Sequence, residues 1–216
     1  MLFKGNKRKI FCIGFNKTGT TSLHELFELA GLRSRHRDRW VHYSHFPEGR
    51  KVLERYDCYS DGEGADFIRL HQWFPDSLFI LNTRSTRSWL RSRVKHAMRL
   101  NRPTTAESAL HEKVFGRMDR EFHCDPEKAL QKWALEKDMY EKQVRLFFQG
   151  SGSLLEIDIT STHDWAKRVL SHIGAPESIA DRQSVHANAR STENIDDIET
   201  LHRYFRMIDA ICPSGI

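Results

Sequence analysis

The sequence has 216 residues, of which 39% are hydrophobic and 29% are charged. Its 34 lysines and arginines outnumber its 29 acidic residues, which gives a net charge of +5 and is compatible with an anionic ligand as well as a nucleic acid. This composition is typical of one globular domain and excludes a repeat array or a disordered tail. No apolar run approaches the roughly 20 residues of a membrane span, so we expect no membrane protein.

The cysteines and the start of the chain bear on the cellular compartment. Cys12, Cys58, Cys124 and Cys212 are spread along the sequence, and no two of them have the C-x-x-C spacing of a zinc or redox site. The first residues are basic but lack the apolar core of a secretory signal. We therefore expect a cytoplasmic protein with free thiols, and not a secreted disulfide scaffold.

The predicted elements alternate between strands and helices. A short apolar run at 9–13 predicts a buried strand, a glycine-bearing loop follows, and apolar residues at helical spacing then predict a helix that ends at Gly31. Residues 33–57 are basic and aromatic and have no clean period. Further strands are predicted at 56–60, 78–81 and 154–159, helices at 67–74, 89–98, 126–148, 165–173 and 195–208, and a loop at 101–108. The alternation predicts an α/β fold with a mostly parallel sheet of four or five strands flanked by helices.

The loop after the first strand has the character of a phosphate cradle. Gly14 and Gly19 have the separation of a nucleotide-binding loop, but Thr20 stands where that motif has its lysine, and the lysine lies inside the loop at Lys17. The backbone N–H groups at a helix N-terminus favour an anion. The strand at 78–81 is followed by Asn-Thr-Arg instead of an aspartate, and we assign Asp158, on a later strand, a structural role. The loop therefore suits a polyanion that is handled without a metal.

Two motifs resemble those of the sulfotransferases that use 3′-phosphoadenosine 5′-phosphosulfate (PAPS). The first is the 5′-phosphosulfate loop, and the second is an arginine at a strand end followed eight residues later by a serine. The matching residues are Lys17, Thr18, Gly19, Thr20 and Thr21 in the loop, and Arg84 and Ser92 in the second motif. The resemblance covers about 9–175, is strongest to small bacterial members, and implies one sulfotransferase-like P-loop domain over 1–216 with a C-terminal helical segment at 176–216.

The resemblance also implies how the donor is bound. The loop residues and Ser22 would contact PAPS, Lys17 would stabilise the leaving phosphate, and Arg84 with Ser92 would bind the 3′-phosphate. Ser22 replaces the tryptophan that stacks on adenine in other members, so adenine recognition must differ here. The C-terminal Arg-Lys-Gly segment of cytosolic animal members is absent, and we expect residues of the VHANAR string to close over the nucleotide instead: His186, Asn188 and Arg190.

The acceptor must lose a proton as the new bond forms, which requires a general base. Cytosolic sulfotransferases place a histidine just after the second strand, about 22 residues before the 3′-phosphate arginine. The residue after the second predicted strand here is Asp61, which precedes Arg84 by 23 residues. The alternative role for Asp61 is to cap a helix that begins at Gly62. The substitutes for the base are Glu63, His71 and His96.

Two other functions remain open from the sequence. One is an ATP-dependent small-molecule kinase, and the other is a non-catalytic nucleotide or nucleic-acid binder, indicated by the arginine-rich residues 33–39. For the sulfotransferase we expect a small-molecule or glycan acceptor with a hydroxyl or amine, no nucleic acid partner and no metal. The expected walls of the acceptor site are Trp40, Tyr43, Phe46 and residues 99–124. Neither the acceptor nor the oligomeric state follows from the sequence.

Overall fold

The computed structural model describes residues 8–37, 39–100, 121–182 and 197–213. The chain forms two compact units, which we call the sheet unit and the helical unit. The sheet unit comprises Met1–Arg84 and Tyr140–Ala189, and the helical unit comprises Ser85–Met139 and Arg190–Ile216. The loop predicted at 101–108 lies outside the described residues, and the predicted single-domain organisation with a boundary near residue 175 stays a prediction.

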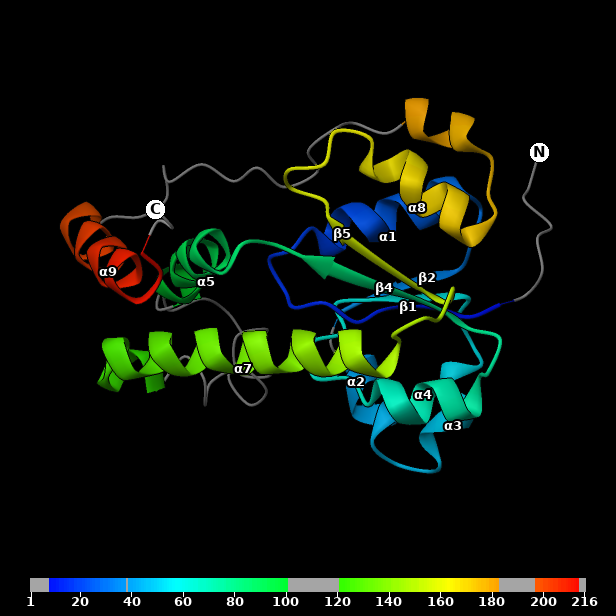
Figure 1. Cartoon of the computed structure of the whole chain (residues 1–216), viewed down its shortest axis with the longest axis horizontal. Helices are drawn as coiled ribbons and strands as arrows, with labels where there is room; N and C mark the ends of the chain where they lie inside the picture. The colour runs from blue at the N-terminus through cyan, green and yellow to red at the C-terminus, as the bar shows by residue number, and fades with distance from the viewer. Residues whose placement is uncertain (1–7, 38, 101–120, 183–196, 214–216) are drawn as a thin grey trace. The chain divides into compact units, whose positions relative to one another are not determined.

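The sheet unit is built on five parallel strands, which confirms the predicted fold class (Figure 1). The order across the sheet is β2-β3-β1-β4-β5. The strands are β1 (Ile10–Cys12), β2 (Ser34–His36), β3 (Cys58–Ser60), β4 (Leu78–Thr83) and β5 (Leu154–Asp158). Since β1 lies between β3 and β4, the chain crosses from one side of β1 to the other after β3. Ligands of open parallel sheets bind outside the carboxyl ends of the strands at such a crossing, so the loops after β1, β3 and β4 are the place to look for a site.

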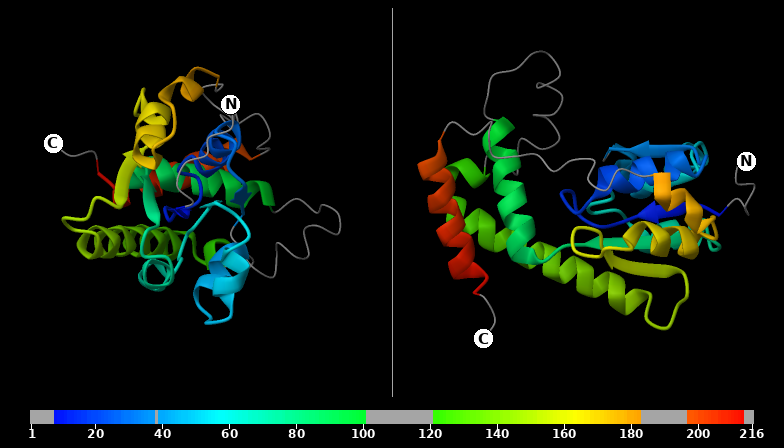
Figure 2. Two further views of the ribbon diagram at one scale, coloured as in Figure 1. Left: turned by 90° about the vertical axis from the view of Figure 1, so that its right-hand side faces the viewer. Right: turned by 90° about the horizontal axis from the view of Figure 1, so that it is seen from above.

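Helices cover both faces of this sheet because successive side chains of a strand point to opposite faces. Ile10 and Cys12 of β1 join one buried cluster, whereas Phe11 and Ile13 join another. On the first face lie α1 (Thr20–Leu29), α8 (Trp165–Ile173) and the short η1 (Glu177–Arg182). On the second face lie α2 (Arg39–Ser44), α3 (Gly49–Leu53), α4 (Phe67–Trp73) and the last turns of α7 (Pro126–Phe147). Figures 1 and 2 show α8 and α4 on opposite sides of the sheet.

The helical unit contains α5 (Thr86–Leu100), the first part of α7 and α9 (Ile198–Ile211). Asp209 of α9 joins α5 through two guanidinium groups, with Arg87 Nε at 2.7 Å and Arg91 Nη2 at 2.8 Å. The Trp133 ring of α7 stacks on Phe122 and lies under the guanidinium of Arg93. These contacts hold α5, α7 and α9 together within the unit.

Two further properties concern the whole described part of the chain. No helix within it is long and apolar enough to cross a membrane. Cys12, Cys58, Cys124 and Cys212 are all free thiols, as the sequence predicts.

Candidate active site

The loop after β1 turns sharply into helix α1. Lys17 has a φ of 63° and Gly19 a φ of 91°, so the chain passes twice through the left-handed region before α1 begins at Thr20. A side chain at Gly19 would be strained by this φ and would meet Ile159 Cγ2 at 3.0 Å. The turn brings the backbone N–H groups of the first turn of α1 to the carboxyl end of β1, where they favour an anion.

The buried side-chain amide of Asn82 supports this loop through hydrogen bonds. Asn82 of β4 has no exposed surface, and its Oδ1 accepts a hydrogen bond from Gly14 N at 3.2 Å, while its Nδ2 donates to Thr18 Oγ1. Gly14 lies so close to β4 that a Cβ there would be 2.1 Å from the Asn82 carbonyl oxygen. Asn82 was not predicted as a site residue, although a polar residue in an otherwise apolar strand is a signal, since buried polar groups need partners.

The role expected of Thr18 changes with this arrangement. Its hydroxyl is fully buried, donates to the carbonyl oxygen of Phe15 and accepts from Asn82. The Thr18 side chain therefore holds the loop in shape, and its hydroxyl proton is not available to a phosphate group. Thr20 is also buried, whereas Thr21 and Ser22 are half-exposed on the first turn of α1.

Arg84 and Lys17 come together, as the two motifs predict. Arg84 follows β4, and its Nη1 donates to the carbonyl oxygen of Lys17 at 3.1 Å. Burial lowers the pKa of Arg84, and the negative charge of Asp158 opposes that effect. Asp158 itself ends β5, and its Oδ1 accepts from Thr160 N at 2.8 Å, which agrees with the structural role expected of it. Ser92 lies on α5 in the helical unit, and its shared use with Arg84 stays a prediction.

Asp61 follows β3 beside the exit of β1. The adjoining Gly62 is packed so closely that a Cβ there would be 2.3 Å from the Cys12 carbonyl oxygen, and Asp61 itself has a φ of 71°. The alternative role of Asp61 as the cap of a helix that begins at Gly62 is wrong, because α4 begins at Phe67, where the apolar spacing predicts it. Its cap is Asp66, whose Oδ1 accepts from Arg69 N at 2.9 Å.

The substitute bases fall in three different places. Glu63 lies at the loop, where its Oε2 accepts from Asn16 N at 3.3 Å, so it is tied to the loop backbone. His71 packs against Phe79, near the amino end of β4, and against Phe148. His96 lies on α5 in the helical unit. The structure thus brings Glu63, but not His71, to the carboxyl ends of the strands.

The expected acceptor walls need one correction. Trp40 is only 2% exposed, because its ring fills the core of the second face and its Nε1 donates to the Ser60 carbonyl oxygen at 2.8 Å. Trp40 is therefore a core residue and not a wall. Tyr43 and Phe46 are exposed, while most of the 99–124 segment and all of His186, Asn188 and Arg190 lie outside the described residues.

His36 is a residue at this edge that the sequence analysis did not select. It ends β2, and its ring lies between the Thr21 hydroxyl of α1 and the Ser60 hydroxyl of β3, at 3.4 Å and 3.0 Å. Burial, together with the charges of His24 and Arg37, lowers the pKa of His36 to about 4. A polar strand of sequence SRH gives no apolar pattern, so β2 and its terminal histidine were not predicted.

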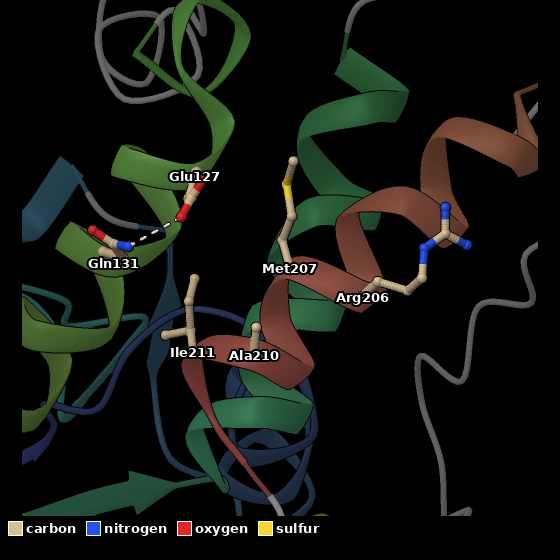
Figure 3. Close-up of a pocket in the computed structure, with 6 residues that line it drawn as sticks. All are labelled: Glu127, Gln131, Arg206, Met207, Ala210 and Ile211. Carbon is tan, nitrogen blue, oxygen red and sulfur yellow. Dashed lines mark hydrogen bonds between the residues drawn. The ribbon is translucent and has the colours of Figure 1, made fainter.

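A hollow of about 570 Å³ lies within the helical unit (Figure 3). Glu127 and Gln131 of α7 line one side of it, and Met207, Ala210 and Ile211 of α9 line the other. Among the predicted site residues that the structure describes, none lines this hollow.

Comparisons with known proteins identify the family of the chain. The protein-family model of the sulfotransferase domain matches residues 9–167 of the sequence. The chain therefore belongs to the sulfotransferase family. The crystal structure of a sulfotransferase from Alicyclobacillus acidocaldarius is similar, with a TM-score of 0.55 over 98% of each chain. The two sequences are 13% identical, so this likeness shows the fold alone. No curated protein matches the chain.

Proposed function

We propose that the protein transfers a sulfuryl group from PAPS to a hydroxyl or amine of a small-molecule or glycan acceptor. The observation that carries the proposal is the contact between the two predicted donor motifs, in which Arg84 after β4 donates to the carbonyl oxygen of Lys17 in the loop after β1. A family member in which the loop that carries Lys17 contacts the Arg84 guanidinium at the carboxyl edge of the sheet has a fitting place for a donor with several negative charges.

The residues present fit the phosphate groups of such a donor. The first turn of α1 supplies backbone N–H groups, and Gly19 leaves its backbone open where a side chain would meet Ile159. We assign the N–H groups of Thr18, Gly19 and Thr20, the hydroxyls of Thr21 and Ser22, and the ammonium of Lys17 to the 5′-phosphosulfate. We assign Arg84 and Ser92 to the 3′-phosphate.

Lys17 and Asp61 carry the chemistry in this proposal. As the S–O bond to the donor phosphate breaks, negative charge grows on that phosphate, and the Lys17 ammonium stabilises it more in the transition state than in the ground state. As the new bond to sulfur forms, Asp61 accepts the proton of the acceptor hydroxyl or amine. The sulfuryl group carries less negative charge than a phosphoryl group, so these residues can act without a metal.

The backbone supports this assignment. Lys17, Arg37 and Asp61 are the non-glycine residues with positive φ in the described part of the chain, and two of them are the proposed catalytic residues. Such conformations cost of order 1–3 kcal/mol each and cluster at functional sites. All three follow the carboxyl ends of strands, namely β1, β2 and β3. We also propose a reducing, cytoplasmic setting, since the four cysteines are free thiols.

Calorimetric titration with the spent donor 3′-phosphoadenosine 5′-phosphate (PAP) tests the proposal. In EDTA, we expect PAP to bind more tightly than AMP or ATP, and we expect sulfuryl transfer from labelled PAPS in a screen of phenols, sugars and amines. Equal affinity for PAP and AMP would remove the basis for the 3′-phosphate site. Phosphoryl transfer from ATP that requires magnesium would show a kinase instead, and salt-dependent affinity for DNA without transfer would show a nucleic-acid binder.

A further inference from the structure

His36 joins three elements of the sheet edge through its two ring nitrogens. Its Nδ1 lies 3.0 Å from Ser60 Oγ at the end of β3, and its Nε2 lies 3.4 Å from Thr21 Oγ1 in the first turn of α1. The ring stacks on His24 of α1 with centroids 5.4 Å apart, and His24 Nδ1 is in turn 2.8 Å from Ser34 Oγ. The imidazole is therefore held in position on its face and at both nitrogens.

The burial of Ser60 fixes the direction of the hydrogen bonds. Ser60 has no exposed surface, and the partner that the described structure gives its hydroxyl is His36 Nδ1. A buried hydroxyl that does not donate its proton loses free energy, so Ser60 donates and Nδ1 accepts. The neutral ring then carries its proton on Nε2 and donates to Thr21 Oγ1. Thr21 is left with its own proton to donate elsewhere.

The charge state of the ring agrees with this direction. Nδ1 accepts a hydrogen bond only when it carries no proton itself, as in the neutral imidazole, and burial favours the neutral form. The titratable groups that act on the ring are His24 from α1 and Arg37 from the same chain segment, and a positive charge on either disfavours a second charge on His36. The imidazole is thus neutral around pH 7.

We propose that His36 is a positioning residue that aims the Thr21 hydroxyl proton at the 5′-phosphate of the donor. The proposal rests on the proposed function, which assigns Thr21 to that phosphate group. His36 touches no ligand in this arrangement, and it acts through Thr21 alone. Its effect is therefore tied to one hydroxyl and to one phosphate of the ligand.

Binding of two nucleotides to matched variants tests this. His36→Phe keeps a ring against His24 but removes both hydrogen bonds, and Thr21→Val removes the hydroxyl at constant shape. We expect each change to raise the Kd of PAP roughly 3- to 10-fold, the usual loss for one hydrogen bond. The double variant should bind PAP no more weakly than Thr21→Val alone, since His36 acts through Thr21. For 3′-AMP, which lacks the 5′-phosphate, all three variants should stay within about twofold of wild type.

Two controls separate positioning from folding. His24→Phe keeps the stacked ring and leaves the Thr21 contact intact, so its PAP affinity should stay within about twofold of wild type. His36→Gln retains an N–H donor for Thr21 and should lose less PAP affinity than His36→Phe; it also serves if the Phe variant does not fold. Additive losses in the double variant, or equal losses for PAP and 3′-AMP, would overturn the proposal and leave His36 a structural residue.

This outcome is distinguishable from a failure of the proposed function. If wild type bound PAP no more tightly than 5′-AMP, the 3′-phosphate site would fail, and the proposed donor would fail with it. The coupling of His36 and Thr21 would still be measured with 5′-AMP, because it concerns the 5′-phosphate.

Discussion

Charged residues have different partners at the two ends of the parallel strands, which we call the amino edge and the carboxyl edge of the sheet. At the amino edge, Arg33 before β2 forms a two-pronged contact with the carboxylate of Asp57, with Nε at 3.1 Å from Oδ2 and Nη2 at 2.8 Å from Oδ1. At the carboxyl edge, Arg84 donates to a neutral carbonyl oxygen of the loop. The carboxylate raises the pKa of Arg33, whereas burial lowers the pKa of Arg84.

This difference between Arg33 and Arg84 distinguishes a charge that stabilises the fold from a charge that is suited to bind a ligand. A cation beside a carboxylate is already neutralised and adds to the free energy of unfolding. Arg84 is half-buried, and its desolvation has a cost that the negative charge of Asp158 offsets in part and that an anionic ligand can relieve further. The lysines do not follow this contrast, because Lys9 at the amino edge donates to the neutral carbonyl oxygens of Glu54 and Tyr56, and burial lowers its pKa.

The largest expected effect is that of removing the base. Asp61→Asn keeps the shape of the side chain but not its basicity, so kcat should fall by about 10²–10⁴, the usual contribution of a positioned base. The melting temperature and PAP affinity should stay near those of wild type. Asp57→Asn at the amino edge is the matched control, with unchanged kcat. An Asp61→Asn enzyme that kept its activity would move the search for the base to Glu63.

The next effect is that of removing the loop lysine. Lys17→Met keeps the length of the side chain but removes its charge from the leaving phosphate, and kcat should fall by about 10²–10³, as for loss of one transition-state donor. PAP affinity should change less than kcat, which steady-state kinetics and calorimetry would show together. Lys9→Met should affect stability and not kcat. If both lysine variants remained active, something other than Lys17 would stabilise the leaving group.

A smaller effect is expected on donor selectivity. Arg84→Ala should weaken PAP binding by about 1.5–3 kcal/mol, the range for a hydrogen bond to a charged group, and leave AMP binding nearly unchanged. Arg33→Ala should leave both affinities within about twofold of wild type, because its guanidinium is paired with Asp57. Parallel titrations of the two variants measure this. An Arg84→Ala protein that still preferred PAP would place the 3′-phosphate elsewhere.

The smallest effect is that of the amino-edge pair on stability. Asp57→Asn should lower the free energy of unfolding by roughly 0.2–1 kcal/mol at pH 7, as for an exposed ion pair. Hydrogen bonding to Arg33 lowers the pKa of Asp57 below its ordinary 3.8, so its contribution is present above that pH and is lost as the pH falls through the lower, folded-state pKa. Urea unfolding of both proteins should show the difference shrink with acid. A difference that persisted at pH 2 would indicate lost packing instead of lost charge.

The sequence predicts the elements whose apolar residues repeat clearly. The first strand, its loop and α1 are confirmed, as is the long helix, predicted at 126–148 and found at Pro126–Phe147. Edge strand β2 was not predicted, because its three residues are polar and partly exposed. Helices α2 and α3 were missed in the same basic segment, where charged and aromatic residues mask the period.

The predicted site shows the same limit. Local motifs predicted where Lys17 and Arg84 lie, because each residue follows a strand whose direction is fixed by the parallel sheet. The structure was needed for contacts between distant segments, such as that of Asn82 with Thr18 and that of His36 with Thr21. The structure was also needed to show that Trp40 is a core residue and not a wall of the acceptor site, since an aromatic residue in a basic segment has no sequence signal for burial.

The Asn82 amide under the loop has a consequence for how the donor binds. Its bonds to Gly14 and Thr18 close the loop on itself before any ligand arrives. The conformational entropy lost in shaping the loop is therefore a cost of folding and not of association. We expect PAP to associate with the wild-type protein in a single kinetic phase, without a slow rearrangement. In Asn82→Ala, which releases the loop, association should be slower or should show a second phase. Stopped-flow binding would reveal whether the cradle is ready-made in this way.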